Sequence, residues 1–190
     1  MTSPLSRSTD KDADQYQLAW WVLPADLFTP VQAFRALRAS GHEGVLLESV
    51  EGVMRLARYS FVAVNPCASL RARAGEVTMT EGGKSKTTKG SALDALRAAL
   101  KSHAVPKAPP GLPPLVGGWL GFFGHEWVTE LEPRIKRQEN DPFGSPDACF
   151  DLFRDVVAFD HATQRLYVIT ACPAGAADRS AAEKKLETLT

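Results

Sequence analysis

Two short segments of the chain carry side chains that together suit the binding of a small charged molecule. Residues 44–52 contain an apolar run that ends in Glu48 and Ser49, and residues 58–60 are an arginine, a tyrosine and a serine. Interpreted as two β-strands with a short connection, they place a carboxylate, hydroxyls and a guanidinium around one strand pair. Such groups suit a zwitterion held against an apolar wall. The residues alone favour a plainer interpretation, a strand pair that ends in solvent with ordinary polar side chains.

Alternation along a strand limits how these side chains can share one ligand. In a regular strand Glu48 and Ser49 point to opposite faces, so either the strand bends at its end or one residue acts through its backbone. In the second segment Arg58 and Ser60 share a face, and Tyr59 lies on the other face. A site that uses all of these side chains therefore requires an irregular strand end.

Three stretches of the sequence resemble one enzyme family. The Leu-Leu-Glu-Ser of residues 46–49, followed by the Arg-Tyr-Ser-Phe of residues 58–61, resembles the amino-terminal region of anthranilate synthase component I. Residues 112–124 and 155–161 resemble the same family, so that the resemblance covers about residues 23–170. In this chorismate-using family of tryptophan biosynthesis, the Leu-Leu-Glu-Ser segment belongs to the feedback site for L-tryptophan.

The resemblance implies an L-tryptophan site at the ends of the strand pair. Its expected residues are Leu47, Glu48, Ser49, Arg58, Tyr59 and Ser60. We expect Glu48 to bind the ammonium, Arg58 the carboxylate and Ser49 either group, with Ser49 at the family's own site position. Burial of the indole contributes roughly 4 to 6 kcal/mol before ordering costs are subtracted.

For the whole subunit, the resemblance implies conversion of chorismate and ammonia to anthranilate and pyruvate. The subunit uses Mg²⁺, and a glutamine amidotransferase partner, component II, delivers the ammonia. The family's catalytic half is expected to be absent from this chain, so we expect no catalytic residue, metal ligand or cofactor here. The alternatives are the matching part of aminodeoxychorismate synthase component I of the folate pathway, or a free-standing small-molecule-binding module.

The expected organisation follows from this resemblance and from composition along the chain. Residues 1–15 are polar and predict a disordered tail, and residues 16–173 the regulatory domain. Residues 174–190 predict a linker and the start of a helix leading to the absent chorismate-binding domain. We expect an α+β fold with largely antiparallel β-sheets packed as a sandwich and a few flanking helices.

Several local patterns predict the elements of this fold. Thr29 begins a Thr-x-x-Gln capping box before a helix, and Ser91 precedes a second helix whose predicted buried stripe is Leu93, Leu96 and Leu100. Residues 156–159 and 166–169 are apolar on both faces, which predicts a hairpin between two layers. The five prolines of residues 104–114 predict an extended connector, because proline disrupts helices and central strands. The glycines of residues 115–124 predict a strand that another backbone segment approaches closely.

Charge and cysteine usage exclude other classes of function. The 22 basic and 22 acidic residues balance, so nothing favours nucleic acid or an anionic membrane as a partner. No stretch reaches the roughly 18 apolar residues of a membrane span. Cys67, Cys149 and Cys172 are widely separated, which predicts free thiols and a cytoplasmic protein. The four histidines show no metal-ligand spacing with one another or with the cysteines, so we expect no metal site.

Overall fold

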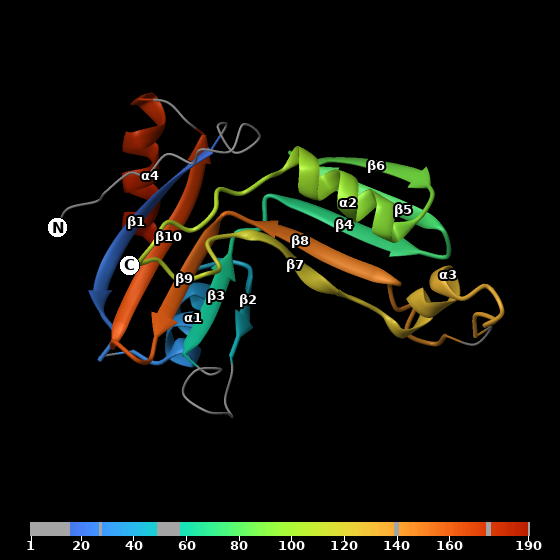
Figure 1. Ribbon diagram of the computed structural model, residues 1–190, viewed down its shortest axis with the longest axis horizontal. Helices are drawn as coiled ribbons and strands as arrows, with labels where there is room; N and C mark the ends of the chain where they lie inside the picture. Colours follow the sequence, from blue (N-terminus) through green and yellow to red (C-terminus); the bar gives the residue numbers. More distant parts are fainter. Residues whose placement is uncertain (1–15, 27, 49–57, 139–140, 174–175, 190) are drawn as a thin grey trace. The chain divides into compact units, whose positions relative to one another are not determined.

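The computed structural model describes residues 16–26, 28–48, 58–138, 141–173 and 176–189. Within these residues, two five-stranded antiparallel sheets with flanking helices make the fold α+β, which confirms the predicted class (Figure 1). The chain divides into two compact units, each built on one sheet. Unit 1 comprises Met1–Pro66, Ala104–Gly118 and Phe153–Thr190, and unit 2 comprises Cys67–His103 and Trp119–Leu152. No helix among the described residues is long and apolar enough to cross a membrane.

The sheet of unit 1 has the strand order β1-β10-β9-β3-β2. Its strands are β1 (Tyr16–Pro24), β2 (Gly44–Leu47), β3 (Tyr59–Val64), β9 (Asp155–Asp160) and β10 (Arg165–Pro173). Strands β9 and β10 form the predicted hairpin, with Val157 opposite Val168. Every residue of β9 is buried, so both faces of the sheet are covered at its centre. This burial explains why its sequence lacks the apolar–polar alternation of a half-solvated strand.

Two helices contribute to the core of unit 1: α1 (Pro30–Ala39) and α4 (Ala176–Thr188). Helix α1 begins at the predicted capping box, since the Gln32 amide donates to Thr29 Oγ1 at 3.2 Å and the Thr29 amide donates to Gln32 Oε1 at 2.9 Å. Leu37 of α1 and Leu186 of α4 join one buried cluster with residues of the sheet, Val62 among them. Both helices therefore bury an apolar side against the same sheet.

The sheet of unit 2 has the strand order β6-β5-β4-β8-β7. Its strands are β4 (Ala68–Arg73), β5 (Glu76–Glu81), β6 (Lys84–Lys89), β7 (Gly118–Phe123) and β8 (Ala148–Phe153). Helix α2 (Ala92–Ser102) packs its buried residues against the apolar side of this sheet, with Leu70 and Phe150 in the same cluster. A 3₁₀ turn, η1 (His125–Trp127), and the short helix α3 (Val128–Leu131) follow β7. One face of the sheet thus carries the core of unit 2.

The predicted stripe of α2 is confirmed at Leu96 and wrong at Leu100. The buried residues are Ala92, Leu96 and Ala99, whereas Leu100 is 51% exposed. Alanines on the sheet side let a helix approach a sheet more closely than leucines would, so the larger Leu100 is left towards solvent. The sequence pattern favoured leucines throughout, and the structure places two alanines beside Leu96 in the contact.

Two predictions about the middle of the chain are confirmed. Residues 104–117 contain no helix or strand, as expected of a proline-rich connector. In β7, a Cβ atom at Gly121 would overlap the backbone carbonyl of Cys149 in the neighbouring β8, so only glycine fits this close approach. The glycines of this stretch therefore serve backbone packing.

Candidate functional site

The register of β2 against β3 brings two of the predicted site segments to one end of a strand pair. The strands are antiparallel, and Leu47, the last residue of β2, lies opposite Phe61. Leu47 is 43% exposed, and Glu48 follows it as an exposed residue beyond the strand end. Ser49 lies outside the described residues. The end of β2 and the start of β3 therefore lie at the same border of the sheet, where apolar and polar side chains are neighbours.

Three side chains form an apolar strip on one face of this border. Leu47 is opposite Phe61 in the register, so the two share a face, and Tyr59 lies on that face two residues before Phe61, at the start of β3. The rings of Tyr59 and Phe61 are tilted by 30° with their centroids 5.8 Å apart. Tyr59 and Phe61 are half-buried. Burial is the main cause that raises the pKa of the Tyr59 hydroxyl. We call Leu47, Tyr59 and Phe61 the apolar strip.

An ion pair lies at the Tyr59 end of the apolar strip. Arg58 donates from Nε to Asp160 Oδ1 at 3.0 Å and from Nη2 to Asp160 Oδ2 at 2.7 Å. The Asp160 side chain is 2% exposed and that of Arg58 is 44% exposed. The Arg58 guanidinium carbon is 4.8 Å from the centre of the Tyr59 ring, which places the charge on the face of the strip. The hydrogen bond from Arg58 is the main cause that lowers the pKa of Asp160 to about 2.

Ser60 lies on the opposite face of β3. Its side chain is buried, and its Oγ is 2.8 Å from Nε2 of His161. The His161 amide donates to the carbonyl of Arg58 at 2.9 Å, so the turn after β9 contacts the start of β3 at two places. The structure thus brings Leu47, Tyr59 and the Arg58 guanidinium to one face and separates Ser60 from them.

Sequence reasoning did not select Asp160 and His161 as site residues. Asp160 is the last residue of β9 and His161 follows it, 102 and 101 residues after Arg58 and Ser60 in the chain. The only signal for them was that residues 155–161, which end in Asp-His, belong to a stretch that resembles the family. Pairing of β3 with β9, which places Tyr59 opposite Asp160, makes the connection.

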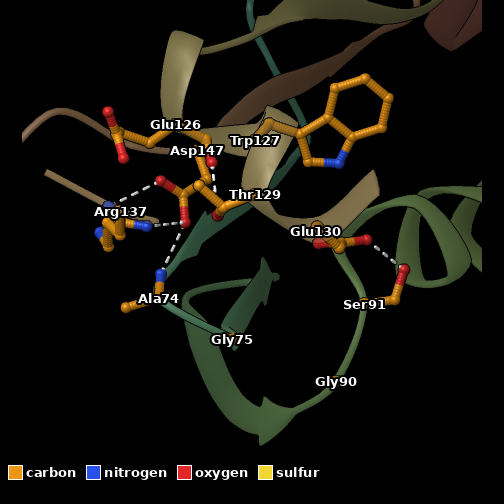
Figure 2. Close-up of a pocket in the computed structure, with 10 residues that line it drawn as sticks. All are labelled: Ala74, Gly75, Gly90, Ser91, Glu126, Trp127, Thr129, Glu130, Arg137 and Asp147. Carbon is orange, nitrogen blue, oxygen red and sulfur yellow. Dashed lines mark hydrogen bonds and ion pairs between the residues drawn. The ribbon is translucent and has the colours of Figure 1, made fainter. Parts of the chain in front are cut away.

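A second candidate is a cleft of about 430 Å³ within unit 2 (Figure 2). Its lining residues are Ala74, Gly75, Gly90, Ser91, Glu126, Trp127, Thr129, Glu130, Arg137 and Asp147. Asp147 accepts hydrogen bonds from both terminal nitrogens of Arg137, each at 2.8 Å, and from the Ala74 amide at 2.6 Å. Burial alone would raise the pKa of Asp147, but the hydrogen bonds from Arg137 and Ala74 outweigh it and lower the pKa.

The other two carboxylates of this cleft also bind groups of the chain itself. Glu130 accepts from Ser91 Oγ at 2.5 Å and from the Ala92 amide at 3.1 Å, which caps the start of α2 (Figure 2). Glu126 accepts from the Gln138 amide at 3.1 Å. Among the described residues, no group of three or more His, Cys, Asp or Glu side chains is arranged to hold a metal ion. The acids of the cleft therefore act first as structural acceptors.

Comparison with known proteins places the chain in a family. Residues 44–190 match the family described as chorismate binding enzyme. The chain is 37% identical over 150 residues to an anthranilate synthase component 1 of Synechocystis, with 78% of this chain and 29% of the relative covered. It is also 37% identical over 140 residues to an anthranilate synthase component 1 of Mycobacterium tuberculosis, with 72% of this chain and 27% of the relative covered.

A solved structure shares the fold. The crystal structure of anthranilate synthase component I from Streptococcus pneumoniae superposes with a TM-score of 0.57 at 24% sequence identity. The alignment covers 88% of this chain and 35% of that one. The chain therefore spans about a third or less of the relatives that it matches.

Proposed function

Because this chain belongs to the chorismate binding enzyme family, we propose that it is the amino-terminal, regulatory part of an anthranilate synthase component I. The names of the relatives support this choice over an aminodeoxychorismate synthase component I or a free-standing binding module. The whole subunit then converts chorismate and ammonia to anthranilate and pyruvate in the cytoplasm. A glutamine amidotransferase, component II, is its partner and supplies the ammonia.

The observation that carries the regulatory role is the arrangement at the end of β2 and β3. An apolar strip that ends at an arginine suits a ligand with an aromatic ring and a carboxylate. Glu48, exposed beyond β2, is the proposed partner of the ammonium group. These features support L-tryptophan as the effector, with Leu47, Glu48, Ser49, Arg58, Tyr59 and Ser60 as the proposed residues.

Tryptophan in this site regulates a reaction that takes place elsewhere in the subunit. Such coupling is allosteric, because two sites and two states of the subunit are linked through one free energy. Mg²⁺ in the whole subunit stabilises negative charge on its substrate. We assign no described residue of this chain to the metal, since none of its acids is grouped to bind one.

Isothermal titration calorimetry of the 190-residue chain with L-tryptophan tests the proposal. We expect saturable binding by the natural chain and at least a tenfold weaker affinity for Ser49→Phe, because the larger side chain fills the site. The matched control is Ser85→Phe in the exposed strand β6 of unit 2, which should bind as the natural chain does. Absence of binding by the natural chain refutes the regulatory role, and equal binding by Ser49→Phe removes Ser49 from the site.

A further inference from the structure

Asp160 holds Arg58 by one edge of its guanidinium. The two hydrogen bonds use Nε and Nη2, at 3.0 and 2.7 Å. Within the described part of the chain, Nη1 has no hydrogen-bond partner, and the side chain is 44% exposed. Arginine carries five donors in a planar fork, so the edge opposite the ion pair still presents donors to solvent. The Asp160 carboxylate thus fixes one edge of the Arg58 guanidinium, and the other edge of the guanidinium stays available.

Asp160 is itself held firmly. Its side chain is 2% exposed, and its Oδ1 also accepts from the Ala162 amide at 3.1 Å in the turn after β9. In the sheet its partner is Tyr59, so its carboxylate and the Tyr59 ring lie on the same face. The low pKa of Asp160 means that the carboxylate is charged throughout the neutral range. The buried carboxylate of Asp160 therefore orients the partly exposed guanidinium of Arg58.

We propose that Asp160 is the positioning residue of this site, and that it directs the free edge of Arg58 to the carboxylate of an aromatic ligand lying along the apolar strip. The inference rests on the proposed function, because it concerns how the same site selects its ligand. Without Asp160, Arg58 has many rotamers of similar energy and no fixed direction. With it, the fork is pre-organised, and recognition of a planar carboxylate costs less ordering.

This arrangement defines a chemical class of ligand. An aromatic ring packs against the strip of Leu47, Phe61 and Tyr59, and the oriented Arg58 donates hydrogen bonds to a carboxylate. An aromatic amine without a carboxylate contacts the strip and gains nothing from Arg58. The site therefore distinguishes aromatic acids from aromatic amines, and Asp160 sets the size of that difference without contacting the ligand.

The test measures three ligands by calorimetry on the 190-residue chain: L-tryptophan, indole-3-propionate, which lacks the ammonium, and tryptamine, which lacks the carboxylate. We expect Asp160→Asn to weaken binding of the two carboxylate ligands at least tenfold and to change tryptamine affinity less than twofold. The matched control is Asp151→Asn, the same substitution at the Arg71–Asp151 pair of unit 2, which should alter none of the three affinities. Arg58→Lys, which keeps the charge and removes the fork, should reproduce the carboxylate-selective loss and leaves the buried acid in place.

The outcomes separate the inference from the function on which it rests. If Asp160→Asn and Arg58→Lys weaken all three ligands equally, or none of them, the positioning role is wrong and the tryptophan site stands. If the natural chain binds no L-tryptophan, the proposed regulatory site fails and the inference fails with it. A loss confined to the two carboxylate ligands in both variants supports the inference, since a loss of folded structure would not spare tryptamine.

Discussion

The sheets of the two units place their polar groups differently. In unit 1, the side chains of Ser60, Asp155, Asp160 and Thr170 in the sheet are almost fully buried, and each is hydrogen-bonded. Asp155 is 0% exposed and accepts from Thr170 Oγ1 at 2.7 Å and from Lys185 Nζ at 2.9 Å, and Asn65 donates to its second oxygen at 3.3 Å. This network joins β9, β10 and α4 around a carboxylate that is shielded from water, although the Lys185 side chain is 44% exposed.

In unit 2, one face of the sheet carries its polar groups in rows. Thr78 and Thr87 are hydrogen-bonded at 2.8 Å across β5 and β6, as are Thr80 and Ser85. The Arg71–Asp151 ion pair joins β4 and β8 on a side where the two side chains are 42% and 24% exposed. Such pairs are screened by solvent and contribute little to stability.

The contrast explains where a binding site is favoured. A sheet buried on both faces tolerates polar groups only where each is paired, so its unpaired donors collect at strand ends such as the start of β3. Arg58 is such a group, held on one edge and open on the other. The cleft of unit 2 has a volume of about 430 Å³, but its acids bind the loops that form it, as Asp147 binds Arg137 and Ala74. Volume alone is therefore a poor guide to the site.

The largest effect that we predict breaks the buried network of unit 1. Asp155→Ala removes the acceptor of Thr170, Asn65 and Lys185 and should lower the free energy of unfolding by about 2 to 4 kcal/mol, mainly because the buried Thr170 hydroxyl is left without a hydrogen-bond partner. Asp151→Ala in unit 2 should cost under about 1 kcal/mol. Urea unfolding followed by circular dichroism measures both. Equal losses in the two variants would mean that burial does not distinguish the two sheets.

A smaller effect tests what unit 2 depends on instead. Gly121→Ala places a methyl group against the Cys149 carbonyl and should destabilise unit 2 by about 1 to 3 kcal/mol, since β7 must move away from β8. The control in the same strand is Phe122→Ala, a residue 54% exposed, which should stay within about 0.5 kcal/mol of the natural chain. Hydrogen exchange followed by mass spectrometry locates the change, and faster exchange confined to peptides of unit 1 would contradict the prediction.

Local signals in the sequence predicted much of the fold. The capping box at Thr29 and the hairpin of β9 and β10 depend on neighbours in the chain, and both are confirmed. The stripe of α2 was wrong at Leu100 because the burial of a helix depends on how closely the sheet approaches it, which the helix sequence does not contain. The hydrophobic pattern did not select Ala92 and Ala99 for the buried stripe, and in the structure both alanines pack against the sheet.

The candidate site was only partly predictable for a related reason. The family resemblance selected Leu47 and the strand pair suggested Arg58, and the structure places Leu47 at the end of β2 and Arg58 directly before β3. Asp160 contacts Arg58 only through the pairing of β3 with β9, a long-range contact that no local pattern encodes. The sequence also suggested that Arg58 and Ser60 share a face. Arg58 precedes β3, however, and its side chain turns towards Asp160 on the other face.

The smallest effect concerns acid, and it compares two Arg–Asp pairs, Arg58–Asp160 of unit 1 and Arg137–Asp147 of unit 2. The pKa of Asp160 is lowered from 3.8 to about 2, and that of Asp147 is lowered as well. A carboxyl group with a lowered pKa stabilises the folded state above its unfolded pKa, and that contribution disappears as the pH falls from about 4 towards 2.

Each pair should therefore lose stability in acid, by about 1 to 2 kcal/mol for Asp160 after allowance for the half-exposed Arg58. Urea unfolding at about pH 4.5 and about pH 2.5 measures the loss. Asp160→Asn should remove this part of the acid dependence from unit 1 alone, because an amide does not titrate there, and Asp147→Asn should remove it from unit 2 alone. If Asp160→Asn retains the whole acid dependence of the natural chain, the pair with Arg58 contributes no stability, and the orientation of Arg58 needs another cause.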